Sequence, residues 1–337
     1  MRVFKLIFSF VIIFQSHAQI SDFEHVDFSK ADSIAIANKN ESLRNLPELT
    51  YKLTADLDSD VEKFRSLFKW ICTNLSNDYG LYVRNKRKRF RFKDDSLKLE
   101  SWNTEFKKII FKKMVNKKKT ICTGYAYLLK ELSDLAGLKC EIVHGFGKTS
   151  TTPIDEDTTP NHSWNVIELN GKWYLADPTW ASGIPNPETN RFEFYFNEGY
   201  FLASPELFSI NHFPLEQRWA LLNEKSPDFQ DFLDAPILYG SAYRHLTGIA
   251  SPKKMHNEIS KNENVIFNYQ LLTAINEDQV KLMIDSGSNN REFKPKTLTI
   301  DEDQLTIAHR FEHTGFYDVH LLIDNKLVST YTVKVNR

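Results

Sequence analysis

The chain contains 337 residues, of which 41% are hydrophobic and 26% are charged, and its formal net charge at pH 7 is −1. This length is sufficient for two domains with a sizeable core, and the composition is that of a globular protein. The balanced charge excludes a global attraction to nucleic acid or to an anionic membrane. We therefore expect no nucleic-acid partner, and electrostatic recognition must depend on local charge clusters. The sequence leaves the oligomeric state open.

The first eighteen residues have the pattern of an export signal. Arg2 and Lys5 precede an apolar run over residues 6–14, and Ser16-His17-Ala18 is typical of a cleavage site. Because this run is far shorter than the ~20 residues of a membrane-spanning helix, we expect residues 1–18 to be removed and the mature protein to have no membrane anchor. An uncleaved anchor is the alternative. The expected location is periplasmic or extracellular.

A capping box, Ser59 with Glu62, precedes apolar residues at helical spacing and predicts a helix over residues 60–76. Residues 84–119 are basic, with fifteen Lys or Arg against four Asp or Glu. Aromatic residues interrupt this segment, which indicates an amphipathic, solvated region. We interpret the run at residues 84–89 as an exposed loop, with recruitment of an anionic polymer or an acidic peptide substrate as the alternative.

The chain has three cysteines, too few for a disulfide scaffold. Cys122 begins a helical apolar pattern that stops at Gly137, so its thiol is expected at a helix N-terminus, a position that favours the thiolate. Cys72 and Cys140 lie in apolar patterns and are interpreted as inert buried side chains. A disulfide between these two is the alternative.

A predicted hairpin carries the other candidate catalytic residues. A strand over residues 139–146 and a polar loop precede two alternating runs, residues 162–169 and 172–177, which are joined by Asn170-Gly171, a strong signal for a two-residue turn. In that register Leu169 faces Lys172, and Trp164 lies opposite Asp177.

This register places His162 diagonal to Asp177 on one face of the hairpin, ~7–8 Å apart between backbones. The same face carries apolar side chains, and we expect it to pack on the helix that begins at Cys122. The sequence therefore predicts a triad in which Cys122 is the nucleophile, His162 the base and Asp177 the group that orients the imidazole.

The C-terminal part of the chain has a different pattern. Residues 186–245 are rich in aromatic residues and proline, and we interpret them as a wrap-around extension of a catalytic domain over residues 19–245. Short alternating strands in residues 246–337 predict a small β-sandwich of the immunoglobulin-like type.

Three motifs occur in the order and spacing of a known family: Thr120-Ile121-Cys122-Thr123-Gly124-Tyr125-Ala126, Asn161-His162-Ser163-Trp164-Asn165 and Trp173-Tyr174-Leu175-Ala176-Asp177-Pro178-Thr179-Trp180. Together they resemble the transglutaminase-like superfamily. The later His212-Phe213-Pro214 motif is similar to bacterial relatives of the kyphoscoliosis peptidase. The resemblance covers about residues 40 to 240.

This resemblance implies a papain-like α+β fold and an acyl-enzyme on Cys122 that passes to water or to an amine, with a protein or peptide as substrate and no cofactor or metal. The backbone N–H of Cys122 is one expected oxyanion donor, and the Trp102 indole, or less so that of Trp70, is the candidate for the second. A cysteine peptidase is the leading hypothesis. A cross-linking transglutaminase and a noncatalytic binding module are the alternatives.

Two further patterns are interpreted as structural. His144 and His212 lack the spacing of zinc ligands, so we expect lone structural histidines. The acidic residues 155–157 lack the ligand spacing of a calcium loop and are expected to be solvated.

Overall fold

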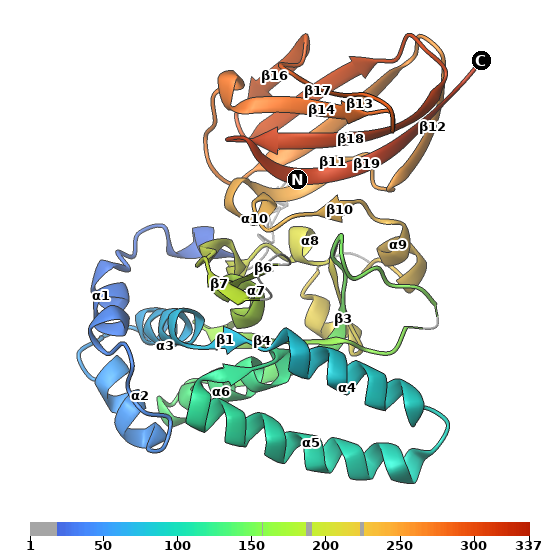
Figure 1. Ribbon diagram of the computed structural model, residues 1–337. Coiled ribbons are helices and arrows are strands. Elements are labelled where there is room, and N and C mark those ends of the chain that lie inside the picture. The colour runs from blue at the N-terminus through green and yellow to red at the C-terminus, as the bar shows by residue number, and fades with distance from the viewer. Residues whose placement is uncertain (1–18, 157, 187–190, 223–225) are drawn as a thin grey trace, which may run out of the picture.

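The computed structural model describes residues 19–156, 158–186, 191–222 and 226–337. The predicted export signal, residues 1–18, lies outside the described residues. Figure 1 shows a helix-rich part around one sheet and, above it, a sandwich formed by the C-terminal strands. Among the described residues, no helix has the length and apolar character needed to cross a bilayer.

The N-terminal helices pack around a buried central helix. They are η1 (Ile20–Phe23), α1 (Ser29–Ala37), α2 (Leu46–Thr54) and α3 (Asp60–Asn74). The predicted capping box is present, because Ser59 Oγ accepts from Glu62 N while Glu62 Oε2 accepts from Ser59 N. Phe64, Phe68 and Trp70 of α3 are fully buried, so this helix lies at the centre of the core.

The sequence analysis predicted an exposed loop at residues 84–89, and this prediction is wrong. These residues are part of a helical hairpin. The hairpin consists of α4 (Tyr79–Arg91) and α5 (Ser96–Lys117), and it joins the paired parallel strands β1 (Ser76–Asn77) and β2 (Lys119–Thr120). Asp78 caps α4 by accepting from Leu81 N, and a small apolar cluster seals the two helices together: Leu81, Trp102, Phe106, Ile110 and Ile121. Lysine and arginine favour helices, so the basic run continues α4 rather than breaking it.

The core sheet has five antiparallel strands. In spatial order they are β8 (Phe201–Ala203), β5 (Lys172–Ala176), β4 (His162–Leu169), β3 (Cys140–Gly147) and β9 (His212–Pro214). The predicted hairpin register is confirmed, because Leu169 pairs with Lys172. Asn170 and Gly171 have φ of 51° and 78°, as a two-residue turn of type I′ requires.

One expectation about this sheet is wrong. Helix α6 (Cys122–Leu135) covers the face that carries Asn165, whose Nδ2 donates to Ala126 O at 2.9 Å. Trp164 points to the opposite face, because side chains alternate along a strand, and there it meets Phe208 of α8 (Pro205–Phe208), with ring centroids 5.8 Å apart. Cys122 and His162 are the first residues of α6 and β4, so they meet at the end of the strand and not across its face.

The segment after Asp177 is built from short elements: α7 (Pro178–Ser182), β6 (Gly183–Asn186), β7 (Arg191–Phe194), η2 (Glu198–Tyr200), η3 (Gln217–Ala220), α9 (Phe229–Asp234), β10 (Ile237–Leu238) and α10 (Ala242–His245). Strands β8 and β9 from this segment form the two edges of the core sheet, and β10 pairs with strand β19 (Lys326–Asn336) of the sandwich. The segment therefore contributes strands to the core sheet and to one sheet of the sandwich.

Two sheets form the C-terminal sandwich. One contains β12 (His256–Ser260), β14 (Val280–Asp285), β15 (Asn290–Phe293), β18 (Gly315–Ile323) and β19 (Lys326–Asn336), and the other β11 (Leu246–Ser251), β13 (Asn264–Leu271), β16 (Thr297–Asp301) and β17 (Gln304–Arg310). The short helix η4 (Glu277–Gln279) precedes β14 and has no buried residue. A shared apolar core lies between the two sheets, and in it the rings of Phe267 and Tyr331 are 5.2 Å apart. This part of the chain is the β-sandwich that the sequence predicts.

Candidate active site

Cys122 is the first residue of α6, where the backbone N–H groups have no partner within the helix. Gly124 allows this helix to approach β2 closely, because a Cβ there would lie 1.8 Å from Thr120 Oγ1. The nucleophile candidate is nearly buried, with 8% of its surface exposed. Its position at a helix N-terminus is as predicted and suits a thiolate.

Cys122 lies beside the residues that begin β4. Its Sγ is 3.9 Å from Asn161 O, and its side chain interacts with His162. The Asn161 side chain fixes this strand end, since its Nδ2 donates to Gly147 O at 3.0 Å while its Oδ1 accepts from Gly147 N at 2.7 Å. Asn161, the residue before His162, is therefore fixed to β3, and its carbonyl oxygen contacts the Cys122 thiol.

His162 is hydrogen-bonded to Asp177, with Nε2 and Oδ2 2.7 Å apart and both residues buried. The imidazole stacks on Trp180, whose ring centroid is 4.8 Å away at an interplanar angle of 20°. Burial alone would lower the pKa of His162, but the Asp177 carboxylate and the hydrogen bond with the Cys122 side chain raise it to about 10. At neutral pH the imidazole is therefore protonated and paired with the Asp177 carboxylate.

Asp177 is the cap of the short helix α7 and the centre of the site. Its Oδ1 accepts from Thr179 N at 2.8 Å and Trp180 N at 3.1 Å, which leaves Oδ2 for side chains. Burial works to raise the pKa of this carboxyl, yet the imidazolium of His162 and the hydrogen bond from His212 hold it far below its usual range. The Asp177 carboxyl is therefore ionised at neutral pH.

His212 of β9 is a member of the site that the sequence analysis interpreted as a lone structural histidine. Its Nε2 lies 3.1 Å from Asp177 Oδ2, its Nδ1 lies 2.8 Å from the side-chain amide of Asn211, and its ring stacks on Phe208 with centroids 3.6 Å apart. Burial lowers the pKa of His212 to about 4, so this imidazole is neutral and donates a hydrogen bond to Asp177. His212 reaches Asp177 because β9 pairs with β3, and the His212-Phe213-Pro214 motif does not reveal this pairing.

The ring nitrogens of His162 and His212 and an Asp177 oxygen lie within 4.8 Å of one another, as three metal ligands could. Both Nε2 atoms, however, point at the same carboxylate oxygen at hydrogen-bonding distance. The arrangement is therefore that of two N–H donors on one acceptor.

The indole N–H groups proposed as oxyanion donors have other partners. Trp102 Nε1 donates to Asn85 Oδ1 at 3.0 Å, and Trp70 Nε1 donates to Asn38 O at 2.8 Å. Tyr82 of α4 lies closer to the chemistry: burial raises its pKa, and its hydroxyl interacts with Cys122 and with the side chain of Asn161. The second oxyanion donor stays a prediction, with the Tyr82 hydroxyl as a candidate that the sequence analysis missed.

The other two cysteines have different surroundings. Cys72 and Cys140 are fully buried and free, so the disulfide alternative is not realised. Burial raises the pKa of the Cys72 thiol well above its usual value and that of Cys140 to about 12. Neither has an imidazole partner among its contacts, which agrees with their interpretation as inert side chains.

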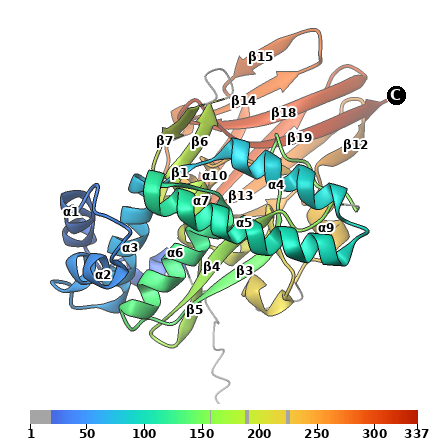
Figure 2. The same ribbon diagram turned by 60° about the horizontal axis from the view of Figure 1, so that its bottom comes forward.

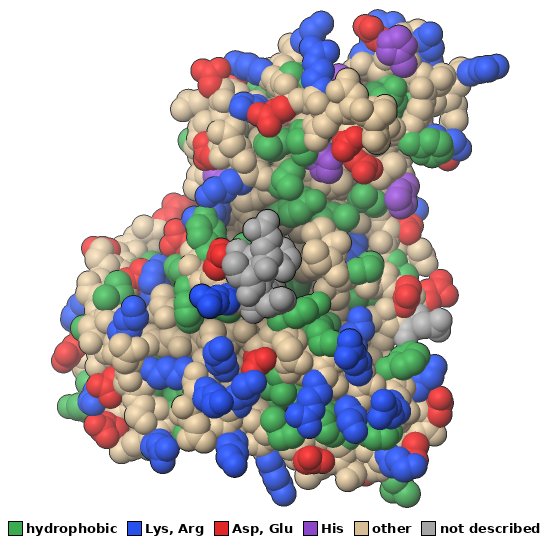
Figure 3. Space-filling view, viewed as in Figure 1, with side chains coloured by type: hydrophobic (Ala, Val, Ile, Leu, Met, Phe, Trp, Pro, Cys, Tyr) green, Lys and Arg blue, Asp and Glu red, His purple; other side chains and the backbone are tan. Residues whose placement is uncertain are grey.

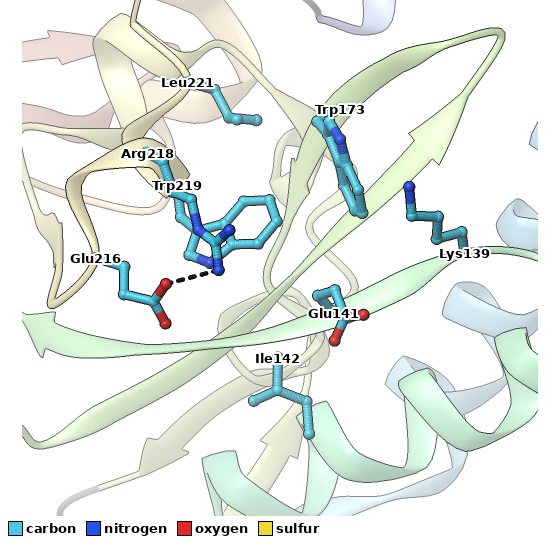
Figure 4. A pocket seen from close by; sticks show the side chains of 8 residues that line it. All are labelled: Lys139, Glu141, Ile142, Trp173, Glu216, Arg218, Trp219 and Leu221. Carbon is cyan, nitrogen blue, oxygen red and sulfur yellow. Dashed lines mark ion pairs between the residues drawn. The ribbon is translucent and has the colours of Figure 1, made fainter.

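A pocket of about 630 Å³ lies at the opposite end of the β4–β5 hairpin (Figure 4). Its lining residues are Lys139, Glu141, Ile142, Trp173, Glu216, Arg218, Trp219 and Leu221. These side chains pair with one another: Arg218 and Glu216 form a 2.7 Å ion pair, and the rings of Trp173 and Trp219 are 5.1 Å apart. None belongs to the triad, so this pocket is separate from the chemistry described above.

Residues 47–178, which include Cys122, His162 and Asp177, match the model of the transglutaminase-like superfamily. The mouse kyphoscoliosis peptidase is 32% identical over 197 residues, and its human counterpart is 31% identical over the same length; each alignment covers 58% of this chain and 27% of the relative. Hillarin from Drosophila melanogaster is 23% identical over 235 residues, which are 65% of this chain and 26% of that protein. The chain thus spans about a quarter of the length of these relatives.

Proposed function

Residues 47–178 form a domain of the transglutaminase-like superfamily, and from this premise we propose that the protein is a thiol hydrolase that cleaves peptide or carboxamide bonds through Cys122. The observation that carries the proposal is the continuous chain from Cys122 through the His162 imidazole to Asp177 Oδ2, with 2.7 Å between His162 Nε2 and that oxygen. Superfamily members include peptidase-like and acyl-transfer enzymes, and both use this chemistry.

The proposed reaction has two steps. The Cys122 thiolate attacks the carbonyl carbon, and the imidazolium of His162 gives its proton to the leaving amine as the C–N bond breaks, which leaves a thioester. His162 then takes a proton from water, whose oxygen attacks the thioester and releases the acid and the thiolate. Because Nε2 faces Asp177, Nδ1 is the ring nitrogen that serves the thiol and the leaving group.

The oxyanion formed in each step needs donors. The backbone N–H of Cys122 is one of the unpaired amides at the start of α6 and supplies the first. Tyr82 is our candidate for the second, because its hydroxyl is near both Cys122 and Asn161. The Trp102 indole could serve as this donor only after its hydrogen bond to Asn85 is broken.

Hydrolysis is preferred over amine transfer because the relatives that match at 31–32% identity are named peptidases. Incorporation of a fluorescent primary amine into a glutamine-containing protein, measured against peptide cleavage, separates the two outcomes. Incorporation that exceeds hydrolysis would assign the chain to the cross-linking class.

The test of the proposed function is the rate at which iodoacetamide modifies the purified protein from pH 4 to pH 9, with the site located by mass spectrometry. We expect rapid labelling of Cys122 near neutral pH and slower labelling in His162→Ala. Cys140, buried and without an imidazole partner, is the internal control. Labelling of Cys122 that rises only near about pH 8.5, as for an ordinary thiol, and that ignores the mutation would favour a noncatalytic binding module.

We also propose that the protein is exported, on the basis of the signal pattern in residues 1–18. N-terminal sequencing of the protein from its native host should begin at residue 19. A native chain that retains residues 1–18 would contradict this proposal.

A further inference from the structure

The charge of this protein is divided very unevenly. Fifteen of its 43 basic residues, but only four of its 44 acidic residues, lie between positions 84 and 119, so this segment carries a formal charge of +11 and the rest of the chain −12. The segment is the α4–α5 hairpin with its connections. Figure 3 shows Lys and Arg side chains gathered over these two helices, in the lower half of the view.

Most of these cations face solvent. The exposed ones are Arg84, Lys86, Arg87, Arg91, Lys93, Lys98, Lys107, Lys108, Lys112, Lys117 and Lys119. Among the described residues, the ion pairs of this segment use only Lys98, with Asp95, and Lys113, with Asp78. Like charges this close repel one another, so the hairpin carries a strong positive field that the fold itself does not neutralise.

The hairpin also borders the candidate active site. Arg89 Nη1 donates to Pro160 O at 3.2 Å, two residues before His162. Near the start of the same helix, the Tyr82 hydroxyl lies by Cys122 and Asn161. The far end of α5 leads through Lys119 of β2 to Cys122. The positive surface therefore runs from the tip of the hairpin to the nucleophile.

We propose that the α4–α5 hairpin binds acidic segments of polypeptide substrates and presents the neighbouring bond to Cys122. This inference rests on the proposed function, and it adds the substrate class. The thirteen residues of α4 give a helix of roughly 20 Å, the length of an extended stretch of about six residues. One run of Asp and Glu is therefore long enough to follow the basic helix toward the site.

An anionic membrane is the rival occupant, because Phe90 and Leu97 are 71% and 78% exposed near the tip of the hairpin. Figures 1 and 2 show the α4–α5 hairpin lying along one side of the molecule. Phe90 and Leu97, the side chains that would enter a bilayer, lie near its tip. The cations, however, continue to Lys117 and Lys119 at the other end. A flexible polymer contacts both ends, and for this reason the polypeptide is favoured.

The test is fluorescence anisotropy of a labelled twelve-residue peptide of alternating Glu and Gly, with Gln in place of Glu as the peptide control. The test variant is Arg84→Glu, Arg87→Glu, Arg91→Glu. The matched variant is Lys261→Glu, Lys296→Glu, Arg310→Glu, which changes the net charge equally but on exposed positions of the sandwich. Vesicles that contain phosphatidylglycerol are the competing ligand.

We expect the Glu peptide to bind at 20 mM NaCl and to weaken at least about tenfold at 500 mM NaCl, because exposed charges are screened. The hairpin variant should weaken binding about tenfold or more and the sandwich variant less than about twofold. The bound peptide should also slow iodoacetamide labelling of Cys122 in the unmodified protein but not in the hairpin variant.

Equal loss in the two variants, no binding at low salt, or tighter binding to the vesicles than to the peptide would overturn the inference. The Cys122 labelling rate without peptide is measured on the same samples and tests the proposed function separately. Rapid labelling without peptide binding overturns the substrate class alone. Slow labelling with hairpin-dependent binding overturns the proposed function and the delivery of substrate to Cys122.

Discussion

Two hairpins meet at Cys122, and they handle charge in opposite ways. The β4–β5 hairpin is almost entirely buried, and the ionisable groups at its open end are hydrogen-bonded at 2.7–3.1 Å. The α4–α5 hairpin exposes eleven cations, of which one is ion-paired among the described residues. Buried charges interact strongly over short distances, whereas exposed charges act weakly but at long range. The buried β4–β5 hairpin therefore suits chemistry, and the exposed α4–α5 hairpin suits the attraction of a charged substrate.

The buried region shows a second contrast, between the two histidines of Asp177. Both place Nε2 on the same carboxylate oxygen, yet the pKa of His162 is raised and that of His212 is lowered. The single negative charge of the Asp177 carboxylate can balance the positive charge of only one buried imidazolium. His162 is that cation because Cys122 is its second partner, while His212, stacked on Phe208, must remain neutral.

The largest effect is expected for Asp177→Asn, which keeps the shape of the side chain and removes its charge. Burial then lowers the pKa of His162 with nothing to oppose it on that side, so the Cys122 thiolate loses its cationic partner. Iodoacetamide labelling of Cys122 at pH 7 should slow by roughly tenfold or more. The free energy of unfolding should fall by about 3–5 kcal/mol, as for a broken buried ion pair.

Urea unfolding followed by tryptophan fluorescence measures this second effect in the catalytic part alone, since all six tryptophans precede residue 220. Asp95→Asn is the control, because Asp95 also caps a helix but is not deeply buried. An equal loss of stability in both variants would mean that helix capping, and not the buried charge, stabilises the site.

Lowering the pH should change the free energy of unfolding by an intermediate amount. Between pH 6.5 and about 4, the unfolded chain protonates His212 while the folded chain does not, so the free energy of unfolding should fall as pH falls, by up to about 3 kcal/mol. His162 does not contribute here because it is protonated in both states; its contribution is lost only as pH rises toward about 10. Asp177 adds to this loss only below about pH 5, where its carboxyl in the unfolded chain begins to take up a proton while the folded one does not.

His212→Gln should flatten this acid dependence in the tryptophan signal. His320→Gln is the control, because burial also lowers the pKa of His320 but this residue lies in β18 of the sandwich. If His212→Gln leaves the slope unchanged between pH 6.5 and 4, then His212 is not the buried neutral group that we describe.

The sequence predicted the β4–β5 hairpin and its triad because their signals are local. Asn170-Gly171 determines the turn, the turn determines the register, and the register places His162 beside Asp177. The motifs were recognisable for the same reason, since each is a short continuous stretch of the chain.

The residues that the sequence analysis missed are those placed by distant pairing. His212 comes to Asp177 because β9 pairs with β3, and Tyr82 comes to Cys122 because β1 pairs with β2 across a 41-residue insertion. The side of the sheet on which α6 packs was predicted wrongly, because both faces carry apolar residues and alternation alone does not distinguish them. A run of cations was interpreted as a loop, although lysine and arginine are good helix formers when the neighbouring turns supply apolar contacts.

The smallest effect concerns the α4–α5 hairpin and sharpens the contrast between the two regions. Three pairs of cations lie four residues apart on α4: Arg84 with Lys88, Arg87 with Arg91, and Arg89 with Lys93 just beyond its end. Each such pair destabilises a helix by about 0.2–0.5 kcal/mol at low ionic strength. Raising NaCl from 20 to 500 mM should therefore protect α4 amides from hydrogen exchange by roughly 1 kcal/mol and leave β4 and β5 amides unchanged. An equal gain in β4 and β5 would show that salt stabilises the whole protein and that α4 carries no special repulsion.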